Sequence, residues 1–330
     1  MAKIRKKYGQ EAQKSKEKYR VTNWSSYNKS LINRGSLTLW INESVVDGWY
    51  YKGNRKPGGK VRYSDRCIES LLSLKALFGL GFRQTEGFAS SLITLLGLNL
   101  EIPSYSQLCR RQAVLPVRLG ATDRQKFSKL SGQEIHVVVD GTGLKVYGEG
   151  EWKVRQHGVG KRRTWRKLHL AIDERTGQVE AVELTGNEVD DAQMMQPLMA
   201  QIQGQIDVVS ADGAYDKAKV YDVLIQRGIY SLIPPRKDAV YWTDEHGNKL
   251  DHPRNTNIAI IKFSNEKIWK KQMGYHRRSK AEVGMYRFKT IFGDRLANRK
   301  MEHQITEARI KCACLNKLTS LGMPRSVKVA

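Results

Sequence analysis

Tyr275, Arg278, Glu282 and Lys289 have types and a spacing that could do chemistry together, in the pattern Y-x-x-R-x-x-x-E-x-x-x-x-x-x-K. Because each residue of an α-helix turns the chain by about 100°, all of them would fall within a sector of about 60° on one helical face. A carboxylate would then lie among two cations and a phenol, which suits a metal-binding acid beside phosphate-binding groups. We therefore expect an enzyme that acts on a polyanion, with further acids elsewhere in the chain.

Two such acids follow predicted strands, and each is itself followed by glycine. Asp140 ends the β-branched run at 135–139, and Asp212 follows the apolar run at 206–210. Binding sites in parallel sheets form at the carboxyl ends of strands, where a late helix carrying Glu282 could pack. Carboxylates with open coordination positions suit Mg²⁺, for which Mn²⁺ can substitute. Two such ions about 4 Å apart could activate a nucleophile and stabilise a leaving oxygen in phosphodiester chemistry.

Each of these acids also has a simpler interpretation. Aspartate commonly forms turns and caps helices, so Asp140 and Asp212 could be turn or cap residues. Glu282 could form a surface ion pair with the arginine four residues before it, worth a few tenths of a kcal/mol. Asp173 and Asp207 are rival acids, but the first lies in a predicted hairpin turn and the second begins its strand. The three-acid interpretation is preferred because it explains the strand-end positions together.

The composition indicates a folded protein with a polyanionic partner. Among 330 residues, 57 Lys and Arg oppose 33 Asp and Glu, giving a formal net charge of +24, while 40% of the residues are hydrophobic. A charge of this size repels itself and points to nucleic acid as the partner. No stretch approaches the roughly 20 apolar residues of a membrane span, and no apolar core follows the basic N-terminus, so we expect neither a membrane partner nor a secretory signal. The cysteines have no zinc-ligand spacing and are expected to be reduced thiols: Cys67, Cys109, Cys312 and Cys314.

The stretch 152–167 is strongly basic and contains no acid. Two tryptophans, Trp152 and Trp165, flank its run of cations, which suits contact with a nucleic-acid backbone combined with base stacking, although a solvated basic hairpin has the same composition. The DNA contacts predicted here are Trp152, Lys153, Arg155, Lys161, Arg162, Arg163, Trp165, Arg166 and Lys167.

Helical periodicity dominates the region before residue 130. Three short helices are predicted over 64–78, 84–97 and 105–113, and the last carries Arg110 and Arg111. This succession resembles a helix-turn-helix unit in which the two arginines contact DNA, and a plain helical bundle is the alternative. We expect a basic arm and linker at 1–60, a helical DNA-binding region at 61–130 and a catalytic domain at 131–330.

From residue 134 the pattern changes to that of a mixed α/β domain. A turn at 141–143 is expected between the first two strands, and 236–265 forms a polar insert of undefined fold. Strands are predicted at 135–139, 144–147, 164–172, 179–184, 206–210 and 230–233. Helices are predicted at 190–203, 217–226, 279–292 and 305–321.

Taken together, these acids and the Tyr-Arg-Glu-Lys spacing resemble the DDE transposases of bacterial insertion sequences, most closely the insertion sequence five family. The sequences Asp-Gly-Thr-Gly at 140–143 and Ser-Ala-Asp-Gly-Ala-Tyr at 210–215 are similar to the family's first and second acid motifs. The resemblance covers about residues 134–320 and implies an RNase H-like fold. It implies that Asp140, Asp212 and Glu282 are catalytic and hold Mg²⁺.

The resemblance also implies the reaction and the partners. Water would cleave phosphodiester bonds at the terminal inverted repeats of the element, and the freed 3′-hydroxyls would then attack target DNA. Tyr275, Arg278 and Lys289 would contact phosphates near the scissile bond, although a solvated surface lysine would also explain Lys289. The expected partners are double-stranded DNA and a second copy of the chain, in the bacterial cytoplasm at the nucleoid. The alternatives are an RNase H-like nuclease without strand transfer and a non-catalytic DNA-binding protein derived from a transposase.

Overall fold

The computed structural model describes residues 18–54, 61–119, 135–147 and 164–329, which belong to two compact units. The smaller unit joins the residues up to Ser36 with those from Leu321 onward, and the larger comprises Leu37–Ser320. In the smaller unit β1 (Lys18–Val21) pairs antiparallel with β7 (Ser326–Val329), and α1 (Trp24–Arg34) follows β1. Of the predicted basic arm and linker at 1–60, residues 1–17 and 55–60 lie outside the described residues.

The larger unit contains a five-stranded mixed sheet in the order β4-β3-β2-β5-β6. The β2–β3 and β3–β4 pairs are antiparallel, whereas the β2–β5 and β5–β6 pairs are parallel. The mixed α/β class predicted from the sequence is therefore confirmed. The strands are β2 (His136–Tyr147), β3 (Thr164–Asp173), β4 (Val179–Thr185), β5 (Val208–Ser210) and β6 (Tyr230–Leu232).

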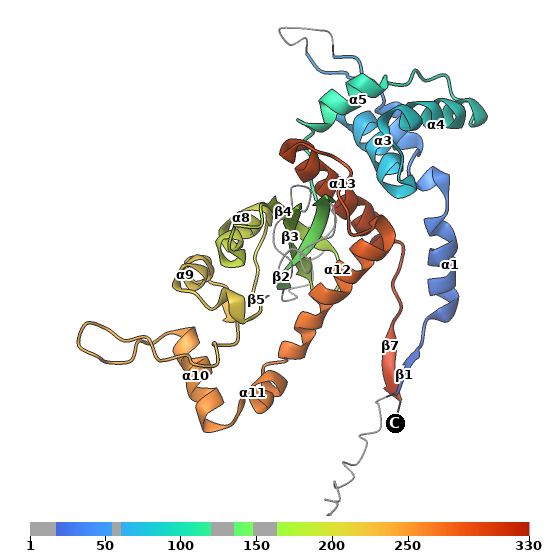
Figure 1. Cartoon of the computed structure of the whole chain (residues 1–330). Helices are drawn as coiled ribbons and strands as arrows, with labels where there is room; N and C mark the ends of the chain where they lie inside the picture. The colour runs from blue at the N-terminus through green and yellow to red at the C-terminus, as the bar shows by residue number, and fades with distance from the viewer. Residues whose placement is uncertain (1–17, 55–60, 120–134, 148–163, 330) are drawn as a thin grey trace, which may run out of the picture. The chain divides into compact units, whose positions relative to one another are not determined.

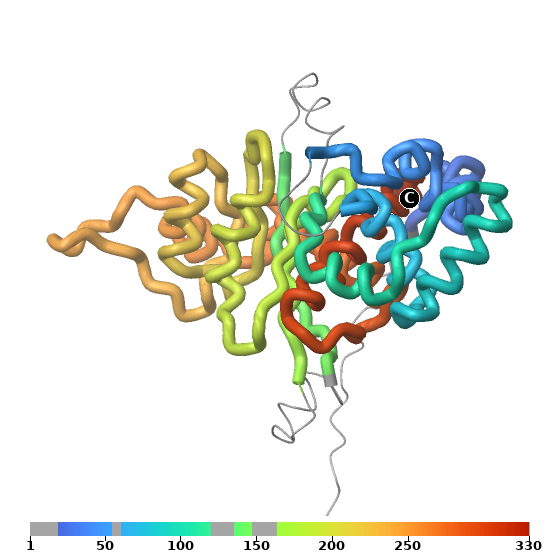
Figure 2. The backbone as a smooth tube through the Cα atoms, turned by 90° about the horizontal axis from the view of Figure 1, so that it is seen from above, coloured from blue at the N-terminus to red at the C-terminus, as the bar shows by residue number. Residues whose placement is uncertain are grey.

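Helices cover both faces of this sheet, as Figures 1 and 2 show from two directions. Because successive strand residues point to opposite faces, Val137 and Val139 join the core under α8 and α9, whereas Leu144 and Val146 join the core under α12 and α13. Gly284 allows α12 to approach β3 closely, since a Cβ there would lie 2.3 Å from Ile172 Cδ1. These helices are α8 (Met195–Gln201), α9 (Ala218–Gln226), α12 (Ser279–Phe292) and α13 (Met301–Ser320).

In the described part of the larger unit, the three longest helices before the sheet have ends that follow from local sequence. Ser64 Oγ caps the first helix by accepting a hydrogen bond from Cys67 N, and Gly79, with a φ of +63°, ends it in the left-handed region where glycine is favoured. The helices are α3 (Asp65–Phe78), α4 (Phe82–Leu95) and α5 (Tyr105–Gln112), close to the predicted ranges. Shorter helical turns precede them at Leu37–Leu39 and Glu43–Asp47.

The predicted boundaries at residues 60 and 130 do not separate compact units in the described part of the chain. Leu71 and Leu74 of α3 share one hydrophobic core with Ile310, Cys314 and Leu318 of α13. Because this core joins the predicted helical DNA-binding region to the predicted catalytic domain, the described residues of both regions fall within the larger unit.

The predicted turn at 141–143 is wrong, because β2 runs without interruption through these residues. Asp140 pairs with Leu170 and Gly143 with Lys167 in the antiparallel ladder to β3. The parallel ladder to β5 ends earlier, with Val138. The glycines that suggested a turn are therefore held extended by a partner strand distant in sequence.

The polar insert contains a helix that the sequence analysis missed. This helix, α10 (Pro253–Phe263), is followed by α11 (Glu266–Gln272). Arg254 Nε donates to Asp216 Oδ1 at 2.7 Å, and both side chains are almost fully buried, so this ion pair anchors the insert to the segment before α9. Pro253 at the first helical position is the local signal that could have identified α10.

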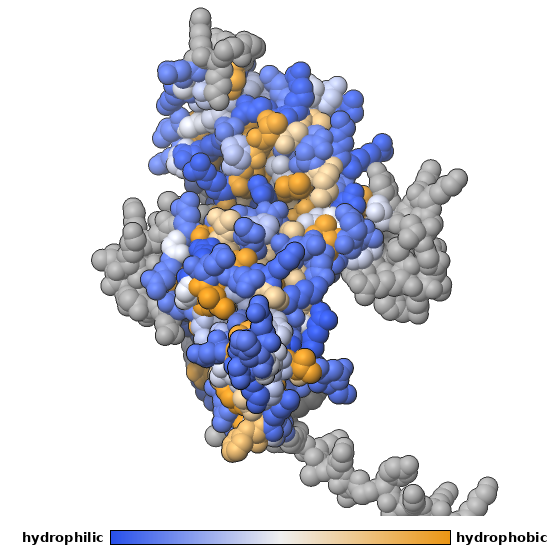
Figure 3. Space-filling model, turned by 90° about the vertical axis from the view of Figure 1, so that its left-hand side faces the viewer, coloured by the Kyte–Doolittle hydropathy of each residue, from blue (hydrophilic) through white to orange (hydrophobic). Residues whose placement is uncertain are grey.

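Most residues on the face shown in Figure 3 are hydrophilic, with hydrophobic residues scattered among them. Among the described residues, no helix is both long enough and apolar enough to cross a membrane.

Candidate active site

The three predicted acids come from two neighbouring strands and the helix that covers them. Asp140 lies within β2, Asp212 follows β5, and Glu282 lies in the first turn of α12. Asp212 Oδ1 also accepts a hydrogen bond from Ala214 N at 2.9 Å and so caps the short turn η3 (Gly213–Tyr215). Its predicted alternative role as a cap is therefore real and coexists with its place beside the other acids.

Arg278 lies between two of the acids and forms an ion pair with each. Its Nη1 is 3.3 Å from Asp140 Oδ2, and its Nη2 is 2.7 Å from Glu282 Oε1. The side chains of Arg278 and Asp140 are 19% and 18% exposed, whereas that of Glu282 is 59% exposed. The i,i+4 ion pair anticipated as the simpler role of Glu282 is thus present, and the same guanidinium extends to the strand.

The pKa of Asp140 shows that the acids influence one another. Burial raises this pKa most, the Gly141 N–H and the Arg278 guanidinium lower it, and the carboxylates of Asp212 and Glu282 raise it again. The net shift is upward. The site is therefore a cluster of mutually repelling carboxylates whose charge one arginine compensates in part.

Tyr275 occupies a different position from the one predicted. It lies in the 3-10 turn η4 (Tyr275–Arg278) before α12 rather than on the helix, and it is 9% exposed. Its hydroxyl donates to Ala211 O at 3.2 Å, and burial raises its pKa to about 12. The left-handed Gly274, with a φ of +63°, separates this turn from α11, and the centroid of the Tyr275 ring lies 5.5 Å from that of Trp269. Tyr275 thus holds the residue before Asp212 in place.

Lys289, the last residue of the predicted pattern, reaches back to β2. Its Nζ donates to Thr142 Oγ1 at 2.7 Å. Thr142 is two residues beyond Asp140, on the same face of the strand. This contact places the lysine beside the acid cluster.

The carboxylate oxygens of Asp140, Asp212 and Glu282 are ligands that suit Mg²⁺ or Mn²⁺, but in this structure they are not arranged around one common metal position. In the described part of the chain, no three His, Cys, Asp or Glu side chains come together as a metal site. Arg278 occupies the position between Asp140 and Glu282. A shared cation would therefore require this guanidinium to leave both carboxylates.

A fourth acid, Asp191, lies on the other face of β2, and the sequence analysis included it only in the helix predicted at 190–203. Its Oδ1 is 3.7 Å from His169 Nδ1 and 3.1 Å from Lys167 Nζ. Both Asp191 Oδ1 and His169 Nδ1 would lie 3.5 Å from a Cβ on Gly141. Burial lowers the pKa of His169 to about 4 despite the opposing effect of Asp191, so the imidazole is neutral at pH 7. The only sequence signal for the cluster of Asp191, His169 and Lys167 was the pair of adjacent aspartates at 190 and 191.

Much of the predicted basic segment, residues 152–163, lies outside the described residues. Trp165 is 5% exposed because its position in β3 turns the ring inward, so the ring is not available for base stacking. Arg166 Nε donates to Gln304 Oε1 at 3.1 Å, and Lys167 Nζ donates to Val189 O at 2.8 Å. These described members of the segment contact the protein itself.

The two arginines predicted to bind DNA from α5 differ in their surroundings. Arg111 Nη1 donates to Tyr63 O at 2.9 Å, and its Nη2 pairs with Asp65, so this side chain joins α5 to the start of α3. Arg110 is exposed.

Solved transposase complexes are distant structural neighbours of the chain. The piggyBac transposase synaptic complex with hairpin DNA has 10% identity, covers 87% of this chain and 73% of that one, and has a TM-score of 0.36. The Mos1 transposase paired-end complex with left transposon end has 11% identity, coverages of 71% and 82%, and a TM-score of 0.24. The Drosophila P element transposase strand transfer complex has 11% identity, coverages of 62% and 42%, and a TM-score of 0.25.

The sequence also matches known families. Residues 32–149 match a family described as a transposase DDE domain. Residues 131–317, more than half of the chain, match a second family with the same description, and they include all three acids. The chain therefore belongs to the transposase DDE domain family.

Proposed function

We propose that this transposase binds the terminal inverted repeats of an insertion sequence of the insertion sequence five family. It cleaves phosphodiester bonds at the element ends and joins the 3′-hydroxyl ends to target DNA. The observation that supports this most is the convergence of Asp140, Asp212 and Glu282 around Arg278, where β5 ends beside the continuing strand β2. The strand order, with an antiparallel β4-β3-β2 half and a parallel β2-β5-β6 half, supports an RNase H-like assignment for the catalytic domain.

In this proposal the three carboxylates hold Mg²⁺, or Mn²⁺ in its place, as two ions per active site. Bound there, the ions would supply an activated nucleophile and stabilisation of the leaving oxygen. Tyr275 keeps the backbone before Asp212 in position through its bond to Ala211 O.

Arg278 and Lys289 are the cations nearest the acids, and both contact residues of β2. Once released from the carboxylates, the Arg278 guanidinium could bind a phosphate of the scissile strand through two parallel hydrogen bonds. A homodimer would hold both element ends, at the bacterial nucleoid.

The test is cleavage of a labelled duplex that carries the element's terminal inverted repeat. Wild-type protein should nick the duplex with Mg²⁺ or Mn²⁺, whereas Asp140→Asn, Asp212→Asn and Glu282→Gln should bind it without cutting. Asp222→Asn, which neutralises an exposed acid on α9, should cut normally and controls for loss of charge alone. Retained cutting by one of the three variants would remove that residue from the site. Nicking without joining of the 3′-hydroxyl to a second duplex would favour a nuclease.

A further inference from the structure

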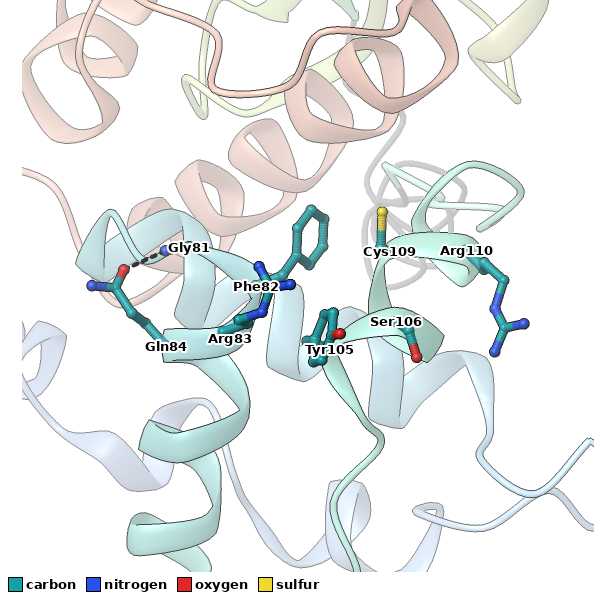
Figure 4. A pocket seen from close by; sticks show the side chains of 8 residues that line it. All are labelled: Gly81, Phe82, Arg83, Gln84, Tyr105, Ser106, Cys109 and Arg110. Atoms are coloured by element: carbon teal, nitrogen blue, oxygen red, sulfur yellow. Dashed lines mark hydrogen bonds between the residues drawn. The ribbon is translucent and has the colours of Figure 1, made fainter.

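A groove of about 730 Å³ lies between the beginning of α4 and α5, away from the acid cluster. Figure 4 shows that Phe82 and Arg83 reach it from α4, and Tyr105 and Cys109 from α5. Arg110 also lines it, next along α5. The groove thus combines apolar walls with two guanidinium groups.

Its cations are arranged for an external anion. Arg83 and Arg110 are exposed, and Arg83 Cζ lies 4.4 Å from the centroid of the Tyr105 ring, so the ring supports the guanidinium through a cation–π contact. The neighbouring acid, Glu86, uses its Oε2 to accept a hydrogen bond from Tyr105 N at 2.6 Å. Arg111, by contrast, is engaged with Asp65 and the Tyr63 carbonyl.

We propose that this groove receives the sugar–phosphate backbone of duplex DNA. A phosphate lies between Arg83 and Arg110, and the adjoining deoxyribose packs against Phe82 and Tyr105. The inference rests on the proposed function, since it assigns a second contact region for the same DNA substrate. It adds Arg83 and Tyr105 to the DNA-binding surface and removes Arg111 from it.

The size and lining of the groove favour DNA over a free anion. A volume of about 730 Å³ far exceeds that of a single phosphate and lies within the range of sites that hold an organic ligand. A small anion would satisfy the arginines but would leave the walls formed by Phe82 and Tyr105 uncovered. The net charge of +24 favours the same polyanionic occupant.

Salt dependence of duplex binding tests the arginines. Loss of the one phosphate contact that the two arginines share should reduce the slope of log K against log salt concentration by about 0.9. The double variant Arg83→Ala/Arg110→Ala should show this reduction equally with specific and unrelated duplexes, because phosphate contacts carry no sequence information. Arg118→Ala/Arg299→Ala removes the same charge from exposed positions outside the groove and should leave the slope closer to that of wild type. Equal reductions in both double variants, or none in the first, would overturn the proposal.

Alkylation of Cys109 tests occupancy in the unaltered protein. Cys109 is partly exposed in the groove, whereas the other three cysteines are buried and burial raises their thiol pKa values: Cys67, Cys312 and Cys314. Iodoacetamide labelling followed by peptide mass spectrometry should therefore report mainly on Cys109. Saturating duplex should slow its labelling at least several-fold, and inorganic phosphate alone should not.

The outcomes separate this inference from the proposed function. Normal duplex binding and cleavage with unprotected Cys109 would overturn the groove assignment and leave the transposase function standing. Protection by inorganic phosphate as strong as that by DNA would assign the groove to a free anion and overturn the proposal. Absence of any duplex binding by wild-type protein would overturn both.

Discussion

Replacing Arg278 by alanine should tighten divalent-metal binding and at the same time impair DNA cleavage. In the structure this arginine neutralises two of the three carboxylates that are proposed to hold the metal. A cation entering the site must displace the guanidinium from Asp140 and Glu282. Removing the side chain removes that competition, but it also removes a group proposed to bind a DNA phosphate.

The structure gives the size of the expected change. The contact with Glu282 is largely exposed and is worth about 0.5 kcal/mol, whereas the better buried contact with Asp140 is worth about 1.5 kcal/mol as a hydrogen bond between charged groups. Together they amount to about 2 kcal/mol, or about 30-fold in the dissociation constant of the metal. Arg278→Lys keeps the charge but cannot bridge both acids with one planar group, so its affinity should be intermediate.

The assay is Mn²⁺ binding to DNA-free protein by calorimetry or electron paramagnetic resonance, with cleavage measured separately. Arg277→Ala is the matched control, because this neighbour is 48% exposed and pairs at 3.8 Å with Glu174 instead. Its metal affinity should equal that of wild type. Unchanged or weakened Mn²⁺ binding by Arg278→Ala would refute the idea that the guanidinium competes with the metal.

Two further predictions concern buried charges and are measured by urea unfolding. Arg254→Met leaves Asp216, whose side chain is 1% exposed, without its ion partner and should lower the free energy of unfolding by about 3–5 kcal/mol; a loss below about 1 kcal/mol would contradict this. Burial alone would raise the pKa of Glu307, but Lys311 and the Ala297 N–H lower this pKa overall in the folded protein. The ionised carboxylate therefore stabilises the fold fully above about pH 4.3, which is the pKa of glutamate in the unfolded chain. This stabilisation is lost as the pH falls through the lower pKa of the folded state. Glu307→Gln should therefore cost about 2 kcal/mol at pH 7 and progressively less in acid, and a cost that stays constant down to pH 3 would argue against this.

Features encoded by neighbouring residues could be predicted from the sequence. The Ser64 cap and the glycine at 79 fix the ends of α3, and the apolar spacing after Ser279 fixes α12. Each of these signals acts over a few residues, so no tertiary contact is needed to interpret it. The same holds for the hairpin turn at Asp173, whose carboxylate accepts hydrogen bonds from Arg175 N and Thr176 Oγ1.

Features that depend on distant partners could not be predicted. The continuity of β2 through Gly141 and Gly143 depends on the ladder to β3, which lies beyond residue 160. The burial of Tyr275 depends on the Ala211 carbonyl, and the bridge from Arg278 to Asp140 spans 138 positions. The helical-face pattern correctly brought Arg278 close to Glu282, but it contained no information on which other group the guanidinium would contact.

The register of the parallel strands explains why the acids meet even though the predicted turn is absent. Val138 and Ser210 form the last pair of the β2–β5 ladder, and Asp140 and Asp212 each follow two residues later. Both carboxylates therefore emerge at the same level, one from a strand that continues and one from a loop. The loop needs an external restraint, which Tyr275 supplies at Ala211, and the turn containing Tyr275 leads directly into the helix that carries Glu282. One short turn thus sets the position of the second acid and the direction of approach of the third.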